Sequence, residues 1–89
     1  MTYDEFMRRW HVYQLSKQAP VARILGKDGF YLLWPRDGGI AAQKIKYHSR
    51  PGSACCEAEP FIINPETITS IGKISVRRAR AARGSVFGT

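Results

Sequence analysis

Residues 21–34 carry the sequence VARILGKDGFYLLW, in which a turn joins two apolar runs. The run Val21–Leu25 is short and partly β-branched, and Phe30–Trp34 contains five apolar residues in succession. Between them lies Gly26–Gly29, where an Asp-Gly pair tolerates the positive φ angles of a tight hairpin. Continuous hydrophobicity, unlike alternation, is typical of a strand that is covered on both faces. We therefore predict a β-hairpin whose second strand is buried on both sides.

The preceding sequence predicts a helix that covers one side of this hairpin. Thr2 and Glu5 have the spacing of a capping box at a helix N-terminus. The apolar residues that follow recur at intervals of three and four, which places on one stripe of the helix Tyr3, Phe6, Met7, Trp10 and Tyr13. We expect this stripe to pack on the second strand of the hairpin. Pro20 is expected to stop the helix, with Lys17 in its last turn.

The rest of the chain predicts short strands and turns. In order, these are a turn at 35–39, an alternating strand at 40–48, a loop at 49–59, a strand at Pro60–Asn64, a turn at 64–66, and in 67–76 a bend around Gly72 before a last strand. The fold class is therefore α+β. We expect either an N-terminal helix packed on a small antiparallel sheet of about four or five strands or an SH3/Sm-like partly closed barrel. One compact domain is predicted for residues 1–76 and a basic tail rich in Arg, Ala and Gly for residues 77–89.

The order of these elements resembles that of the Sm-like barrels, a family that includes bacterial RNA chaperones. The resemblance is carried by the order helix, hairpin, long strand and strand–turn–strand, with Val21–Leu33 and Phe61–Ile74 as the first and last hairpins. Asn64-Pro65-Glu66 stands where those chaperones have a Tyr-Lys-His type motif. The resemblance thus implies an architecture, and no site residue is carried over from it.

The chain is strongly basic. It contains 14 Lys and Arg against 7 Asp and Glu, a formal net charge of +7. Four of the cations open the tail, at Arg77, Arg78, Arg80 and Arg83. Excess positive charge raises the local concentration of polyanions around a protein. We therefore expect the partner to be nucleic acid or an acidic protein surface.

Several classes of protein are disfavoured. No apolar run approaches the ~20 residues of a membrane-spanning helix, so we expect no membrane partner. Asp4 and Glu5 lie where a secretory signal would be basic. Cys55 and Cys56 are adjacent and cannot reach ordinary disulfide geometry without strain. Together these features predict a reducing, cytoplasmic setting.

The candidate binding residues form two groups. The first lies on or just after one face of the predicted strand 40–48 and consists of Lys44, Lys46, His48 and Arg50. The second is the four tail arginines, whose guanidinium groups can pair bidentately with phosphate or carboxylate. Tyr31 and Trp34 are candidates for stacking on bases beside these cations. Alternatively, the lysines are the solvated face of the sheet and the arginines a solubilising tail.

The sequence offers little for catalysis or metal binding. His11, His48 and the cysteine pair lack the spacing of zinc motifs, and neither histidine has an orienting carboxylate beside it in the sequence. The Gly-rich turns precede no helix, so they are not predicted to cradle phosphate. We expect no enzyme activity, no metal and no cofactor.

Two functional hypotheses follow. The first is a small basic module that binds the phosphate backbone of RNA or single-stranded DNA with the lysine face and the arginine tail. The second is a non-enzymatic protein-interaction module, such as a mobile-element-encoded inhibitor or adaptor, which docks on a larger acidic partner or nucleoprotein complex through aromatic and arginine side chains. A homo-oligomer is compatible with either hypothesis.

Overall fold

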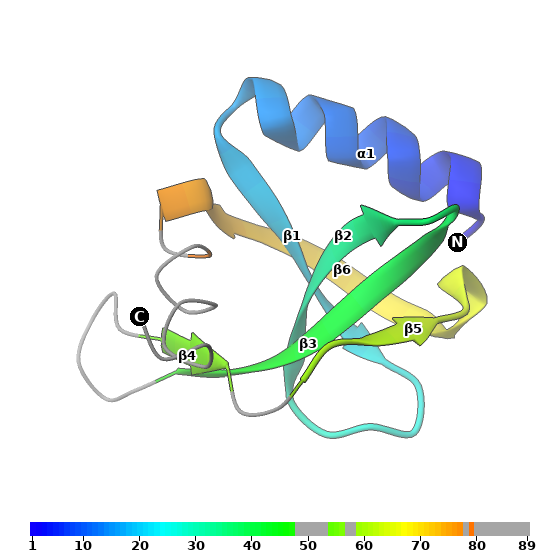
Figure 1. Cartoon of the computed structure of the whole chain (residues 1–89), viewed down its shortest axis with the longest axis vertical. Coiled ribbons are helices and arrows are strands. Elements are labelled where there is room, and N and C mark those ends of the chain that lie inside the picture. The colour runs from blue at the N-terminus through cyan, green and yellow to red at the C-terminus, as the bar shows by residue number, and fades with distance from the viewer. Residues whose placement is uncertain (48–53, 57–58, 78, 80–89) are drawn as a thin grey trace.

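A computed structural model describes residues 1–47, 54–56, 59–77 and 79 of the chain (Figure 1). Its elements are, in order, α1 (Tyr3–Leu15), β1 (Gln18–Ile24), β2 (Phe30–Arg36), β3 (Gly39–Tyr47), β4 (Ala54–Cys56), β5 (Phe61–Ile63), the 3₁₀ turn η1 (Pro65–Thr67) and β6 (Ile68–Ser75). After β6, the backbone is helical at Val76, Arg77 and Ala79.

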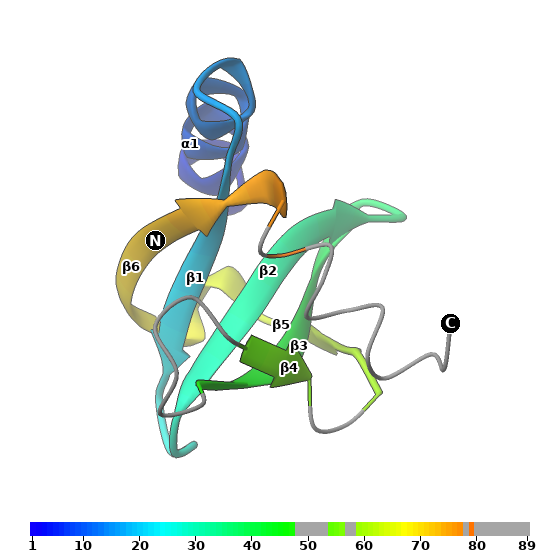
Figure 2. The same cartoon turned by 90° about the vertical axis from the view of Figure 1, so that its left-hand side faces the viewer.

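The strands form one antiparallel sheet in the order β4-β3-β2-β1-β6, and β5 pairs with β3 next to β4. Figure 2 shows the strong twist of this sheet, with α1 lying on one side of it. Among the strands that the structure describes, neither β4 nor β5 pairs with β6, so the sheet stays open. The α+β prediction of a helix packed on an antiparallel sheet is confirmed, whereas the alternative of a partly closed barrel is not formed.

The helix α1 begins at the predicted cap and ends earlier than predicted. The backbone N–H of Glu5 donates to the hydroxyl oxygen of Thr2 at 3.2 Å. At the other end, α1 stops at Leu15, and Lys17 reverses the chain with a φ of 54°. Pro20 therefore lies inside β1 rather than ending the helix, and Lys17 lies beyond the last turn. Pro20 pairs with Lys73 of β6 and precedes the residues of β1 that pair with β2, so its missing N–H falls outside the β1–β2 ladder.

Both predicted hairpin turns use backbone in the left-handed region. In the connection from β1 to β2, Gly26 and Gly29 have φ angles of 76° and 87°. β2 and β3 are joined by Asp37 and Gly38 alone, with φ angles of 49° and 79°. Two successive positive φ angles are the mark of a type I′ turn, whose twist matches that of the paired strands. This two-residue loop fixes the register between β2 and β3.

As predicted, β2 is buried on both faces. On the side of α1, Tyr31 and Leu33 share a core with Phe6 of the helix, together with Ala22, Ile24, Ile40, Ala42, Ile63 and Ile68. On the opposite side, Leu32 packs in a second core with Ala19, Val21, Ile45 and Ala79. Since Ala79 follows β6, the beginning of the predicted tail supplies part of the cover for this second face.

Two segments differ from the prediction. β4 lies within residues 49–59, which were expected to be a loop, and its backbone, including Cys55 and Cys56, pairs with the end of β3. A strand of three residues is too short to show a period of two in the sequence. In the second segment, β6 is continuous from Ile68 to Ser75, and Gly72 lies opposite Val21 without a bend.

The packing of α1 yields a stability prediction. Phe6 is fully buried, whereas Leu15 on the same helix is 86% exposed. We expect Phe6→Ala to lower the free energy of unfolding by about 3–5 kcal/mol, because it leaves a cavity in the core. Leu15→Ala, the control, should change it by less than about 0.5 kcal/mol. Urea denaturation measures both values, and an equal loss at the two positions would contradict the packing of α1.

Candidate nucleic-acid interface

Every charged residue in the sheet is a cation. The six strands that the structure describes contain no Asp or Glu, and their charged residues are Arg23, Arg36, Lys44, Lys46 and Lys73. The acidic residues of the chain lie outside these strands. Strands that carry one sign of charge attract polyanions. The exposed carboxylate of Asp28 lies in the β1–β2 connection, two residues before Phe30.

Phe30 is the most exposed residue of the apolar run Phe30–Trp34, at 42% of its surface. The guanidinium carbon of Arg23 lies 5.6 Å from the centroid of its ring, within the range of a cation–π interaction. The hairpin register explains this contact. Val21 pairs with Leu32, so Arg23 falls opposite Phe30 two residues further along the antiparallel pair. Arg23 therefore helps to position an aromatic ring at the surface of the sheet.

A hollow borders Phe30 on the side of β6. Its volume is about 270 Å³, and it is lined by Val21, Phe30, Gly72, Lys73 and Ile74. Gly72 keeps it open, since a Cβ at this position would meet only the carbonyl oxygen of Val21, at 3.9 Å. Lys73 also lines the hollow, but it alternates with Gly72 and Ile74 in β6, so its exposed side chain leaves from the other face of this strand at the edge of the described sheet. We call Arg23, Phe30, Gly72 and Lys73 the Phe30 platform.

In the lysine face predicted from the sequence, the structure describes the side chain of Lys44 alone. Lys44 is half-buried and passes close to Gly29, and it shares a face of the sheet with its partner Tyr31. The ring of Tyr31 packs edge-on against Phe61, with centroids 5.8 Å apart, and is 6% exposed. Tyr31 therefore belongs to the core and offers no ring face for stacking. Trp34 is half-buried further along β2.

Among the remaining binding residues predicted from the sequence, the structure describes the side chain of Arg77 and not those of the others. Arg77 directly follows β6 and Val76 and is exposed. The backbone of Lys46 belongs to β3, but the structure does not describe its side chain. Outside the described residues lie His48, Arg50, Arg78, Arg80 and Arg83. Their part in binding stays a prediction from the sequence.

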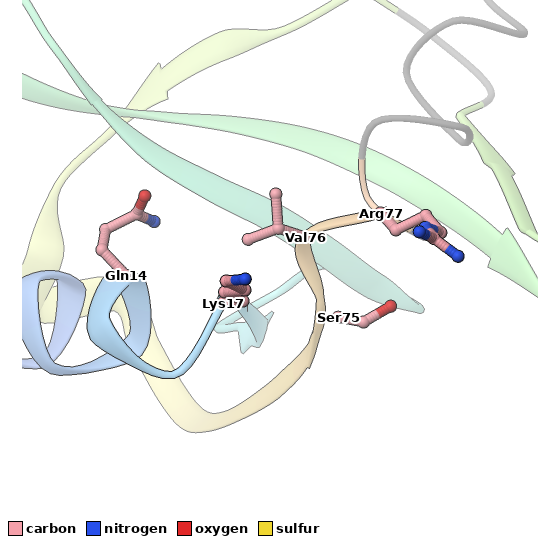
Figure 3. Close-up of a pocket in the computed structure, with 5 residues that line it drawn as sticks. All are labelled: Gln14, Lys17, Ser75, Val76 and Arg77. Carbon is pink, nitrogen blue, oxygen red and sulfur yellow. The ribbon is translucent and has the colours of Figure 1, made fainter.

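A larger cavity opens between the end of α1 and the end of β6 (Figure 3). Its volume is about 820 Å³, and its described lining consists of Gln14, Lys17, Ser75, Val76 and Arg77. The N–H of Val76 donates to the carbonyl oxygen of Lys17 at 2.9 Å and ties the two segments together. Figure 3 shows Lys17 and Arg77 on either side of Val76. The fold thus brings two cations from distant parts of the sequence to one cavity.

The Phe30 platform was not predicted, for a physical reason. Phe30 opens an apolar run, and such a run predicts burial for all of its members. Lys73 reaches the platform only through the pairing of β6 with β1, which is long-range. The predicted turn at Gly26–Gly29 does not reveal the contact either, because a four-residue loop would place Leu25 opposite Phe30, whereas the observed register places Arg23 there.

No group of three or more His, Cys, Asp or Glu gathers as a metal site within the described residues. In that same part of the chain, no helix combines the length and the apolar character needed to cross a membrane. Comparisons with protein-family models, curated proteins and solved structures gave no match to the chain.

The open hollow beside Phe30 yields a second stability prediction. Gly72 lies inside β6 with space for a side chain. A glycine within a strand costs about 0.5–1 kcal/mol relative to alanine, and valine is favoured in strands. We therefore expect Gly72→Val to keep or raise the midpoint of thermal unfolding while it fills the hollow. Circular dichroism measures this midpoint, and a clear decrease would show that the hollow is closed in the folded protein.

Proposed function

We propose that this protein binds single-stranded nucleic acid, either RNA or single-stranded DNA, on the Phe30 platform. The observation that carries the proposal is an exposed aromatic ring in contact with a cation, Arg23, on a sheet whose described strands contain no carboxylate. One base stacks on Phe30 and Arg23 pairs with a neighbouring phosphate, while Lys73 reaches a further phosphate around the edge of β6. Aromatic side chains within a cationic surface are a common means of holding single strands without sequence preference.

Two physical effects supply the binding free energy. Stacking of a base on an aromatic side chain contributes about 1–3 kcal/mol. Each phosphate neutralised by Lys or Arg releases condensed counterions, which favours binding and makes it sensitive to salt. One base and two phosphates give only modest affinity. We therefore expect added contacts from Arg77 and from the candidates predicted from the sequence, the tail arginines and the lysine face.

The chemistry of the platform also predicts its selectivity. The ring of Phe30 has no hydrogen-bonding group, so it accepts the face of any base. Bases in a duplex are already stacked on one another, and their faces are not available. We therefore expect single strands to bind more tightly than duplexes, with a weak preference among sequences.

Salt dependence tests the phosphate contacts. On a single strand, the logarithm of the binding constant should fall with the logarithm of salt concentration, with a slope of roughly −0.7 per contact. Arg23→Gln combined with Lys73→Gln should flatten that slope by about 1.4, because two contacts are lost. The matched control is Arg8→Gln with Arg9→Gln, which removes two exposed cations from α1. Fluorescence anisotropy of a labelled oligonucleotide measures each slope, and equal flattening in both double variants would reject the platform.

Substitution of the ring tests the stacking. Phe30→Ala should weaken binding about 5- to 150-fold, which corresponds to the loss of about 1–3 kcal/mol from one stacked base. Gly72→Val should also weaken binding, because it fills the hollow beside the ring. Leu25→Ala is the control, since Leu25 is 70% exposed and lies in the β1–β2 turn rather than on the platform. Thermal midpoints are measured in parallel, so that a loss of binding is separated from a loss of folding.

A protein partner is the competing function, and one observation favours it. On α1, Val12 is 58% exposed and Leu15 is 86% exposed. Binding through such apolar residues depends on a few anchors and resists salt. If wild-type protein binds no oligonucleotide more tightly than a generic polycation does, the nucleic-acid proposal is rejected. A protein target would then be the better hypothesis.

A further inference from the structure

An apolar pocket adjoins the cavity of Figure 3. Its volume is about 200 Å³, and its lining includes Trp10, Gln14, Leu33, Trp34, Val76 and Ala79. Gln14 and Val76 line both the pocket and the cavity, so the two hollows are neighbours that share part of their walls. The cavity carries two cations, and the pocket contains both tryptophans of the chain. This combination of a charged mouth and an aromatic interior suits a ligand with one charged end and one flat, apolar end.

Lys17, at the mouth, has a backbone conformation that does not favour lysine. Its φ of 54° is in the left-handed region, where glycine is the preferred residue after a helix. The hydrogen bond from Val76 uses the carbonyl oxygen of Lys17, which any residue would supply. The lysine side chain is therefore not needed for this turn. The side chain of Lys17 therefore extends from the turn to the cavity that it lines.

We propose that the cavity and the pocket form one nucleotide subsite. The base enters the apolar pocket beside Trp10 and Trp34, and the phosphate lies in the cavity with Lys17 and Arg77. A pocket of about 200 Å³ is smaller than the roughly 300–1,000 Å³ of sites that enclose whole ligands, so it has room for a single ring system. The inference rests on the proposed function, to which it adds a specific second contact.

The position of this subsite relative to the Phe30 platform fits one bound strand. Phe30 lies opposite Arg23, which pairs with Ser70, and Ser75 of the cavity is five residues further along β6, a separation of about 17 Å in a β-strand. A single strand that follows β6 can therefore place one base on Phe30 and a later nucleotide in the subsite. Binding at one site then raises the effective concentration of the same nucleic-acid strand at the other site.

Gln14 gives the subsite a preference that the platform lacks. Its amide offers a donor and an acceptor at the boundary between cavity and pocket. This pair of groups matches the donor and acceptor on the edge of adenine. We expect adenine nucleotides to bind more tightly than the other three. Gln14→Leu, which keeps the bulk of the side chain, should abolish that difference.

Tryptophan fluorescence reports directly on the subsite, because both tryptophans line the pocket. The probes are adenosine 5′-monophosphate, adenosine and inorganic phosphate. The nucleotide should cause a saturable change in emission. Adenosine should bind roughly tenfold more weakly, because it lacks the charge-assisted contacts of the phosphate. Inorganic phosphate should compete with the nucleotide without changing the emission itself.

Lys17→Gly separates a binding role from a structural one. The variant should raise the thermal midpoint, because glycine is favoured at this φ, and should weaken nucleotide binding roughly tenfold through loss of the cation. Lys27→Gly is the matched control, since Lys27 is an exposed lysine in the β1–β2 connection, at the other end of β1. It should leave nucleotide binding unchanged. Wild-type affinity in Lys17→Gly would overturn the subsite.

An oligonucleotide titrated in parallel distinguishes this inference from the proposed function. Binding of the oligonucleotide through Phe30, with no tryptophan change from any mononucleotide, would reject the subsite and leave the proposed function standing. Binding of the mononucleotide without binding of the oligonucleotide would support the subsite as a site for free nucleotides and reject the proposed function. Binding of both, each weakened by Lys17→Gly, is the result that we expect.

Discussion

The β1–β2 hairpin has apolar side chains on both of its faces, so water must be excluded from both. Leu33 faces α1, and Leu32 faces the segment that follows β6. A chain of 89 residues has few elements with which to cover two faces. The helix covers one, and Ala79 lies on the other together with residues of the sheet itself. One cover thus precedes the hairpin in the sequence, and part of the other follows β6.

The same constraint explains the position of the candidate interface. Burial is strongest in the middle of β2, at Tyr31, Leu32 and Leu33, and it ends at Phe30. The ring of Phe30 remains at the surface with Arg23 beside it, and the pairing of β6 with β1 adds Lys73. The start of β1 follows the C-terminal end of α1, and there Lys17 lines the second cavity. The two candidate sites therefore lie at opposite ends of β1.

Local patterns in the sequence were sufficient to predict the cap at Thr2, the helical stripe that contains Phe6 and the burial of β2 on both faces. Each of these depends on residues that are close together in the chain. The end of α1 could not be predicted, because Lys17 adopts a conformation for which the sequence would normally show glycine. The position of Lys73 at the edge of the hollow depends on long-range pairing between β1 and β6, for which the sequence has no local signal. The fold was thus largely predictable, whereas the platform was not.

The central claim is that a single strand lies on the Phe30 platform and follows β6. Amide chemical shifts of isotope-labelled protein, recorded as an unlabelled oligonucleotide is added, test it residue by residue. The account predicts the largest shifts at Arg23, Phe30, Gly72 and Lys73, with little change on the exposed side of α1 around Val12. Shifts confined to α1, or none at any concentration of oligonucleotide, would contradict it.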